Sequence, residues 1–260
     1  MTVVGVVVLQ LAVTPGDVDG NVDRVVAAVR EHGGTADLVV APELVTTGYD
    51  LDLLRSKGKQ LAEPIDGPSV RRLVAAAVEA EVTLVAGFLE ASDGQVYDAL
   101  VTVTPNGSAT TYRKTHLYPP ELDCFASGTA LGPVATPAGT LGPLICFEHA
   151  FPEVATTLAL AGAEILVIPS AVPDGYEHLL SLRTRARGQD NQIFAIGCNL
   201  TGNGFCGRSL VSDPRGEVLA EAGAEETVLH ARLDLDAVQR ERAREPSLRL
   251  RRPDLYTSPD

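Results

Sequence analysis

The sequence predicts an α/β fold built from two related halves, each with a buried sheet and covering helices. Short apolar runs typical of buried strands alternate with stretches whose apolar residues recur at helical spacing. An internal repeat matches Ala36 to Pro42 with Ala163 to Pro169, and Gly48 to Asp50 with Gly175 to Glu177 at the same offset. At 260 residues and 45% hydrophobic content, the chain suits one large core. We therefore expect two packed sheets with helices outside.

The first half alternates strand, helix and strand. The expected strands are residues 3–12, 37–41 and 82–89, and residues 84–113 form a β-meander because Asp93-Gly94 and Asn106-Gly107 favour tight turns. Two amphipathic helices lie between them. Their apolar faces are Val22, Val25, Val26 and Val29, and then Val70, Leu73, Val74, Ala77 and Val78.

The second half follows the same plan. Gly142 to Cys146 is expected to be a strand, Pro152 to open a helix, and Glu164 to Pro169 to form the next strand. The repeat aligns Glu43 with Ser170, so a carboxylate belongs to one half only. We expect a functional site where the two halves differ in this way.

Composition excludes several classes of function. The net charge of -13 disfavours nucleic acid and anionic membranes as partners, because both need clustered cations. No apolar run approaches the ~18 residues that span a bilayer, and the apolar N-terminus lacks the basic residues of a signal peptide. Four cysteines form no C-x-x-C pair, which favours reduced thiols. We expect a soluble, cytoplasmic protein that acts on a small molecule.

Three short motifs carry the residues of a thiol hydrolase. They are Ala41-Pro42-Glu43, Tyr112 to Leu117 with Lys114 at its centre, and Leu144 to Glu148 with Cys146 at its centre. A carboxylate base, an ammonium and a thiol together supply the proton acceptor, the oxyanion donor and the nucleophile. This trio needs no metal and no cofactor, and we predict neither.

The three ordered motifs resemble the signatures of the nitrilase, or carbon-nitrogen hydrolase, superfamily over nearly the whole chain. The resemblance implies a four-layer αββα sandwich, formed by residues 1–260 as one domain. It implies that Glu43 is the general base, Lys114 stabilises the tetrahedral intermediate and Cys146 is the nucleophile. A second active-site glutamate of the family matches Glu121. The resemblance also implies a homodimer or larger assembly, with the tail of residues 247–260 contacting a partner subunit.

The position of Cys146, after a strand and before a helix, predicts a lowered thiol pKa and a thiolate near neutral pH. Lys114 and the backbone N–H of Phe147 are the expected oxyanion donors, and Glu43 is expected to activate water. We place Phe147, Tyr49, Ala150 and Ser170 around the substrate.

Substrate choice depends on residues near the nucleophile and on loops 47–58, 118–130 and 171–178. Related enzymes for acidic substrates often carry arginine at the position of Ala150, and nitrilases usually carry tryptophan at the position of Phe147. With Phe125 and Tyr176 also expected near the pocket, the sequence favours a neutral or weakly polar short carboxamide. The alternatives are an N-carbamoyl-amine, a nitrile, or a non-enzymatic binding or regulatory role on the same scaffold.

Overall fold

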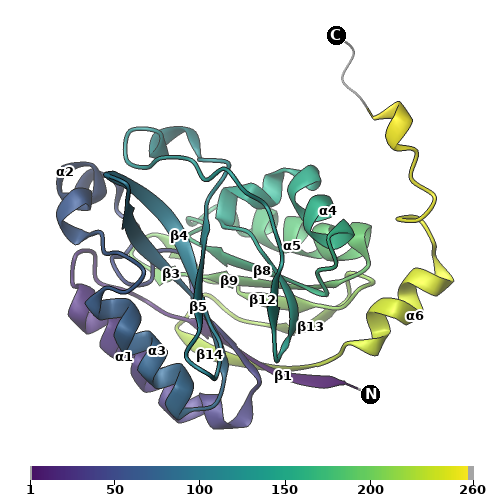
Figure 1. The fold of residues 1–260 in the computed structure, drawn as a ribbon, viewed down its shortest axis with the longest axis horizontal. Helices are drawn as coiled ribbons and strands as arrows, with labels where there is room; N and C mark the ends of the chain where they lie inside the picture. The colour runs from purple at the N-terminus through teal and green to yellow at the C-terminus, as the bar shows by residue number, and fades with distance from the viewer. Residues whose placement is uncertain (1, 257–260) are drawn as a thin grey trace.

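Two six-stranded sheets pack face to face in the computed structural model, which describes residues 2–256 (Figure 1). The strand order is β14-β1-β2-β3-β4-β5 in the first sheet and β13-β12-β9-β8-β7-β6 in the second. The first sheet contains β1 (Val3–Gln10), β2 (Leu38–Val40), β3 (Thr83–Ser92), β4 (Gln95–Val103), β5 (Ala109–Arg113) and β14 (Thr227–Asp234). The second contains β6 (Val134–Thr136), β7 (Gly139–Pro143), β8 (Ile165–Ser170), β9 (Phe194–Asn199), β12 (Leu210–Ser212) and β13 (Val218–Glu221).

The two sheets repeat one topology. Strands β1, β2 and β3 are parallel, as are β7, β8 and β9, and antiparallel strands flank each trio. Strands β2 and β8, which carry the sequence repeat, each lie at the centre of their parallel trio. The prediction of two pseudo-symmetric halves is therefore confirmed.

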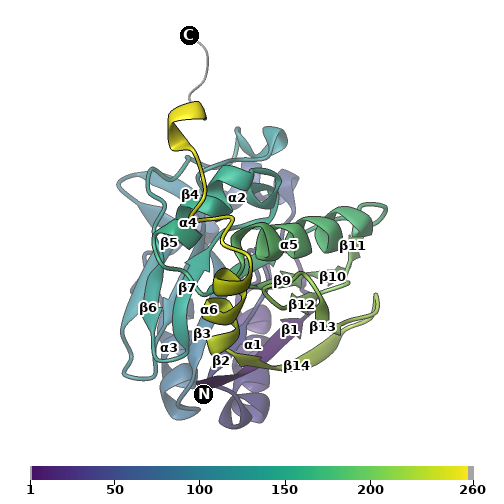
Figure 2. The ribbon, with the colours of Figure 1, turned by 90° about the vertical axis from the view of Figure 1, so that its right-hand side faces the viewer.

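Helices cover the outer face of each sheet. Helices α1 (Val18–His32) and α3 (Pro68–Glu79) lie side by side on the first sheet, and α4 (Pro152–Leu160) and α5 (Glu177–Asn191) lie on the second (Figures 1 and 2). Helix α2 (Leu51–Leu61) lies near the end of the first sheet, and α6 (Asp236–Arg244) follows β14. A short ribbon of β10 (Thr201–Gly202) and β11 (Phe205–Cys206) and 3-10 turns at 33–35, 119–121, 146–150 and 253–255 complete the fold.

The side chains of β1 point alternately to the two faces of the first sheet, so this strand packs against the layers on both sides. Val7 packs in the cluster that contains Val25 of α1 and Leu73 of α3, on the helix side of the sheet. Val8 packs in the cluster that contains Val167 of β8, between the sheets. Because successive side chains of a strand point to opposite faces, one apolar strand serves both interfaces. Each such buried valine stabilises the fold by roughly 1.5–3 kcal/mol.

Two local predictions are wrong. Strand β7 ends at Pro143, so Cys146 does not end a strand but begins the 3-10 turn of Cys146–Ala150. The expected loop 47–58 is partly helix α2, because Asp50 caps it by accepting hydrogen bonds from the N–H groups of Asp52 and Leu53. The aspartate at the cap was the signal for this helix.

After α6 the chain first lies against the body, where Pro246 and Leu248 line a small pocket with Leu160 of α4, and its last described residues then extend away (Figure 1). Leu250, Leu255 and Tyr256 are exposed on it. Residues 257–260 of the expected tail lie outside the described residues, and the contact of the tail with a partner subunit stays a prediction. Within residues 2–256, no helix combines the length and apolar character needed to cross a membrane.

Candidate active site

The three motif residues lie just beyond strand ends on the two sheets. Glu43 follows β2, Lys114 follows β5 directly, and Cys146 comes three residues after β7. The Lys114 backbone N–H still donates to the Asp98 carbonyl at 2.9 Å, which continues the β4–β5 pairing. Glu43 and Lys114 are fully buried, whereas Cys146 is partly accessible. The packing of the two sheets therefore brings together side chains that lie far apart in the sequence.

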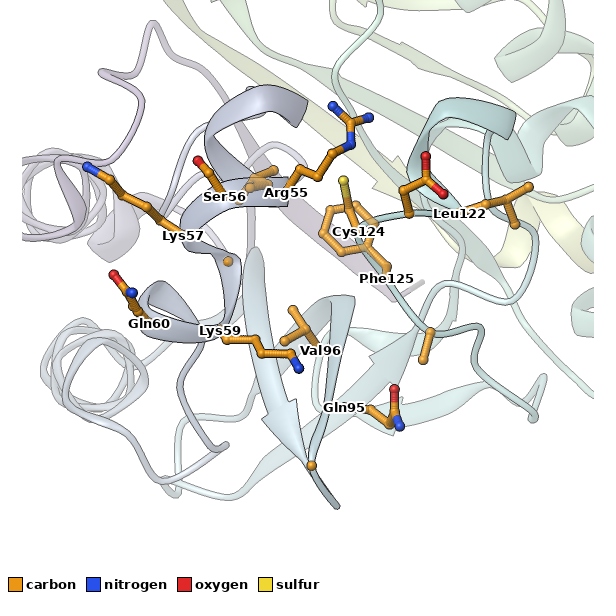
Figure 3. Close-up of a pocket in the computed structure, with 15 residues that line it drawn as sticks. Arg55, Ser56, Lys57, Lys59, Gln60, Gln95, Val96, Leu122, Cys124 and Phe125 are labelled. Carbon is orange, nitrogen blue, oxygen red and sulfur yellow. The ribbon is translucent and has the colours of Figure 1, made fainter.

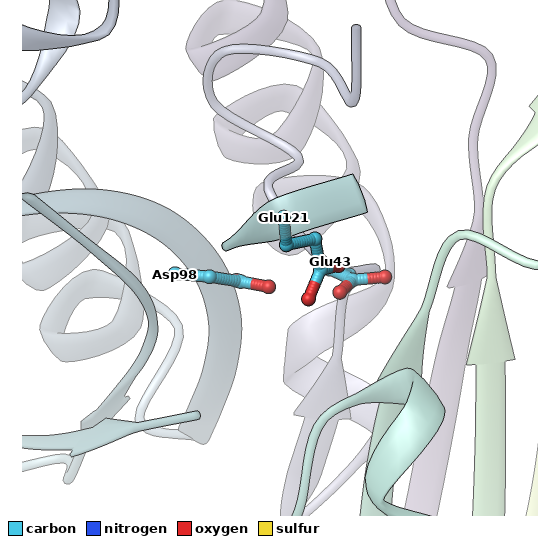
Figure 4. Close-up of side chains that lie close together, drawn as sticks. All are labelled: Glu43, Asp98 and Glu121. Atoms are coloured by element: carbon cyan, nitrogen blue, oxygen red, sulfur yellow. The ribbon is translucent and has the colours of Figure 1, made fainter. Parts of the chain in front are cut away.

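The Lys114 ammonium is surrounded by three buried carboxylates. Its Nζ lies 2.6 Å from Glu43 Oε1, 2.7 Å from Glu121 Oε1 and 3.1 Å from Asp98 Oδ2. Figure 4 shows the three carboxylates converging, and one oxygen of each lies within 4.8 Å of the others. Such a cluster can hold a cation, and the ammonium of Lys114 takes that place.

Charge in this cluster is unbalanced, because three carboxylates face one ammonium. Burial raises the pKa of Glu43 and raises that of Asp98 further, although the Lys114 charge opposes both shifts. Burial also disfavours the charge of Lys114, but the three carboxylates outweigh it and raise the pKa of Lys114 well above its usual range. The ammonium therefore stays charged, and Glu43 and Asp98 hold their protons to a higher pH than free carboxyl groups do. Sequence reasoning missed Asp98, which no motif marks.

The backbone is strained next to the carboxylate and at the thiol. Leu44, directly after Glu43, has φ of 42°, and Cys146 itself has φ of 40°. Both lie in the left-handed region that non-glycine residues rarely adopt. Gly87 supports the first turn, because a Cβ at that position would meet the Leu44 nitrogen at 2.3 Å. These turns hold Glu43 and Cys146 in fixed positions.

The expected lowering of the Cys146 pKa is wrong. Burial raises the pKa of its thiol well above the usual range, the Glu43 charge adds to the shift, and Lys114 only partly opposes it. The helix after the nucleophile, α4, begins at Pro152, so its N-terminus is not at Cys146. The resting side chain is therefore a thiol that needs a base.

Glu148 anchors the nucleophile turn, a role that sequence reasoning did not assign. Its buried carboxylate accepts hydrogen bonds from the N–H of Ile145 at 2.7 Å, the N–H of Thr115 at 2.8 Å and the hydroxyl of Tyr112 at 2.8 Å. These donors connect the segment after Lys114 to the residue before Cys146. The hydrogen bond from the Ile145 N–H to Glu148 is one half of a capping box, but Ile145 has no side-chain acceptor for the other half, so the sequence signature was absent.

A cavity of about 480 Å³ opens onto the nucleophile and is lined mainly by apolar side chains. Tyr49, Glu121 and Phe147 line it, and the Tyr49 hydroxyl donates to Glu121 Oε1 at 2.6 Å. Ala150 and Ser170 are not in the wall, and the buried Ser170 hydroxyl donates to the Ile168 carbonyl at 3.0 Å. The remaining lining residues are Leu51, Tyr118, Cys146, His149, Ala171, Val172, Pro173, Tyr176, Leu179, Arg183, Asn203, Gly204 and Phe205.

A second cavity of about 430 Å³ lies beside α2 (Figure 3). Cys124 and Phe125 line it together with Arg55, Lys57 and Lys59, but none of Glu43, Lys114 and Cys146 does. Phe125, which was expected near the substrate, therefore lines this second cavity and not the first, and it packs in the cluster that contains Leu44 and Leu54. The chemistry belongs to the first cavity.

The fold is a four-layer sandwich, and it brings a thiol, an ammonium and carboxylates together beside one cavity. These features define a class of protein, the hydrolases with a cysteine nucleophile. Within that class, the chain belongs to the carbon-nitrogen hydrolase family, whose model matches residues 5–243. Cys146 is its catalytic cysteine, at the position that the third motif gives it.

Curated relatives and solved structures agree with this assignment. The chain is 36% identical to an (R)-stereoselective amidase of a Pseudomonas species over 236 residues, which covers 89% of this chain and 85% of the relative. It is 33% identical to the 2-oxoglutaramate amidase of Bacillus subtilis, over 95% and 97% of the two chains. The carbon-nitrogen hydrolase of Helicobacter pylori superimposes with a TM-score of 0.91 at 28% identity, over 98% and 97%.

One structural neighbour carries a modified nucleophile. A variant of the amidase from Nesterenkonia sp. AN1, with acrylamide added at its active-site cysteine, has a TM-score of 0.81 and 25% identity. The superposition covers 92% of this chain and 97% of that one. The adduct, which a Michael addition formed, marks the active-site cysteine of that protein as a nucleophile.

Proposed function

We propose that the protein hydrolyses the carbon-nitrogen bond of a small carboxamide to a carboxylic acid and ammonia through a thioester on Cys146. One observation carries the proposal: Glu43 Oε1 lies 2.6 Å from Lys114 Nζ, and the same cluster adjoins the cavity that Cys146 lines. The amidase relatives and the amidase structure support the same reaction.

In the first half-reaction Glu43 accepts the proton of the Cys146 thiol as Sγ attacks the amide carbon. Burial raises the pKa of both groups, so the proton passes between two sites of low polarity and no free thiolate is required. The amide oxygen becomes an oxyanion. Lys114 and the backbone N–H of Phe147 are the donors that stabilise it.

The intermediate then collapses to a thioester. The carbon-nitrogen bond breaks, and the proton held by Glu43 passes to the departing nitrogen, which leaves as ammonia. Water attacks the thioester carbon in the second half-reaction while Glu43 accepts a proton from it. The carbon-sulfur bond breaks, the acid is released and the proton returns to sulfur.

Glu121 and Tyr49 act as positioning residues in this scheme. Glu121 holds Nζ of Lys114 at 2.7 Å, and Tyr49 donates to the same carboxylate oxygen. This pairing keeps the ammonium directed at the cavity end of the cluster. Phe147 packs edge to face against Tyr118 and Phe151, which makes its ring part of the wall.

We also propose that the protein acts in the cytoplasm as a homodimer. All four cysteines are unpaired in the structure, which suits a reducing compartment. The exposed Leu250, Leu255 and Tyr256 beyond α6 give the tail apolar side chains for contact with a second copy. Sedimentation of the full chain and of a form ending at Arg244 tests the assembly.

The reaction is tested by ammonia release from a panel of alkyl amides, ω-amides, carbamoyl-amines and nitriles. We expect release from a subset of amides, and a loss of at least about 10³-fold in Cys146→Ala. Cys124→Ser is the matched control, because Cys124 lies outside the catalytic cavity. Release that survives in Cys146→Ala would contradict the proposed nucleophile.

A further inference from the structure

The catalytic cavity contains a cation that the proposed reaction does not use. Arg183 of α5 lines the cavity together with Cys146, among mainly apolar neighbours. The acidic residue of the cavity wall is Glu121, whose Oε1 is already bonded to Lys114 and Tyr49. Among the described residues, Arg183 is the one lysine or arginine of this wall, and Glu121 is not its partner.

The polar partner that the structure gives Arg183 is uncharged. Its Nη1 lies 3.1 Å from Nε2 of His149, and within residues 2–256 no carboxylate forms an ion pair with it. Its neighbour Arg187, one turn along the helix, pairs with Asp190 at 3.3 Å. Arg183 is partly buried, and its guanidinium lacks the counter-ion that Arg187 has, so a negatively charged ligand in the cavity can pair with it.

His149 is a neutral hydrogen-bond partner of Arg183 and not a second cation of the cavity. Burial, and then the charges of Arg183 and Arg187, lower its pKa to about 3, so the ring is neutral at physiological pH. Because a guanidinium only donates, Nε2 must accept and Nδ1 must carry the proton. Nδ1 is buried and has no hydrogen-bond partner in the described structure. His149 therefore occupies one donor of Arg183, and the remaining guanidinium N–H groups are the donors that this side chain can offer to a ligand.

We propose that Arg183, oriented by His149, binds a carboxylate on the substrate, so that the preferred substrate is an amide with a carboxylate at its far end. This inference rests on the proposed function. The inference revises the expected substrate. Ala150 in place of an arginine favoured an amide with an uncharged acyl chain, but Arg183 of α5 supplies a cation to the same cavity. A planar guanidinium binds a carboxylate with two parallel hydrogen bonds, which also fixes the orientation of the amide.

The decisive experiment compares substrates that differ in one charged group. Succinamate and glutaramate are paired with butyramide and valeramide, and kcat/KM is measured for the wild type, Arg183→Gln and Arg183→Lys. We expect the wild type to prefer the carboxylate of each pair, and Arg183→Gln to reduce that preference about 10- to 100-fold. Arg183→Lys should retain part of it, because the charge remains while the paired hydrogen bonds are lost.

Arg185→Gln is the matched control, because it removes an equal charge from the same helix at an exposed residue outside the cavity. It should leave the preference unchanged. Binding to the inactive Cys146→Ala variant, measured by calorimetry, gives a second readout: glutaramate should bind more tightly than valeramide, and Arg183→Gln should remove the difference.

The outcomes separate this inference from the proposed function. Two results would overturn the role of Arg183 and leave the proposed amide hydrolysis standing. One is hydrolysis of alkyl amides with no preference for the carboxylate substrates, and the other is a preference that survives in Arg183→Gln. A folded wild type that hydrolyses no amide of either series and binds none in the Cys146→Ala form overturns both.

Discussion

Lys114 Nζ lies 2.6 Å from Glu43 Oε1, although Lys114 follows the edge strand β5 and Glu43 follows the central strand β2 of the same sheet. Neither side chain is exposed to solvent. Such a pair gains little for stability over an apolar pair, because both charges lose their hydration. The reaction proposed above explains its presence, because that reaction uses a base and an oxyanion donor away from water.

Removing the ammonium is expected to destabilise the fold as well as abolish activity. Lys114→Met leaves Glu43, Asp98 and Glu121 buried without their cation, which should lower the free energy of unfolding by about 3–5 kcal/mol. Urea unfolding followed by circular dichroism measures the change. Lys59→Met, at an exposed lysine, is the control. Equal stability of the two variants would contradict the central role of Lys114 in the cluster.

Asp98→Asn is expected to increase stability, and more so at higher pH. Burial raises the pKa of Asp98 well above its ordinary value of 3.8, so the folded protein holds a proton that the unfolded chain releases. Between the unfolded and the folded pKa, wild-type stability therefore falls as pH rises. Asparagine has no such proton, yet its amide oxygen can still accept from Lys114.

Thermal unfolding of wild type and Asp98→Asn from pH 5 to pH 8 tests this expectation. The difference in Tm should grow with pH, and Asp123→Asn, at an exposed carboxylate, should show no such trend. A constant or shrinking difference would show that Asp98 is ionised in the folded protein. Activity of Asp98→Asn should stay within about tenfold of wild type, because no proton transfer is assigned to Asp98.

The pH dependence of kcat/KM should reflect the displaced pKa of Glu43. The base must be ionised, so activity is lost as pH falls through its pKa, which burial raises above 4.5. The Lys114 pKa is raised well above 10.5, so loss of its charge causes no decline on the alkaline side up to that pH. An acid limb centred at or below pH 4.5 would show that Glu43 is not the titrating base.

Glu148→Ala is expected to lower both stability and kcat. The change leaves the N–H of Ile145, the N–H of Thr115 and the hydroxyl of Tyr112 without an acceptor, at about 1–3 kcal/mol for each donor that stays buried. The turn that holds Cys146 then loses its anchor. Glu153→Ala, at an exposed glutamate of α4, should change unfolding and turnover only slightly. A variant with full kcat would exclude a positioning role.

The sequence predicted the two halves because their strands are short continuous apolar runs, and the repeat set equivalent positions for β2 and β8. Three motifs gave the family and, with it, the catalytic cysteine. Asp98 escaped prediction because its place beside Lys114 depends on a contact between side chains 16 residues apart, which no local pattern encodes. The Cys146 pKa was misjudged because burial depends on how tightly the two sheets close around the thiol.

Covalent capture at Cys146 shows whether hydrolysis passes through a thioester on this residue. The wild type is mixed with a hydrolysed amide, quenched in acid during turnover, and analysed by intact mass and peptide mapping. We predict an added acyl group on Cys146, its absence after the amide is exhausted, and none on Cys124, Cys198 or Cys206. Turnover with no acyl group on the protein, or an acyl group on another residue, would contradict the thioester mechanism.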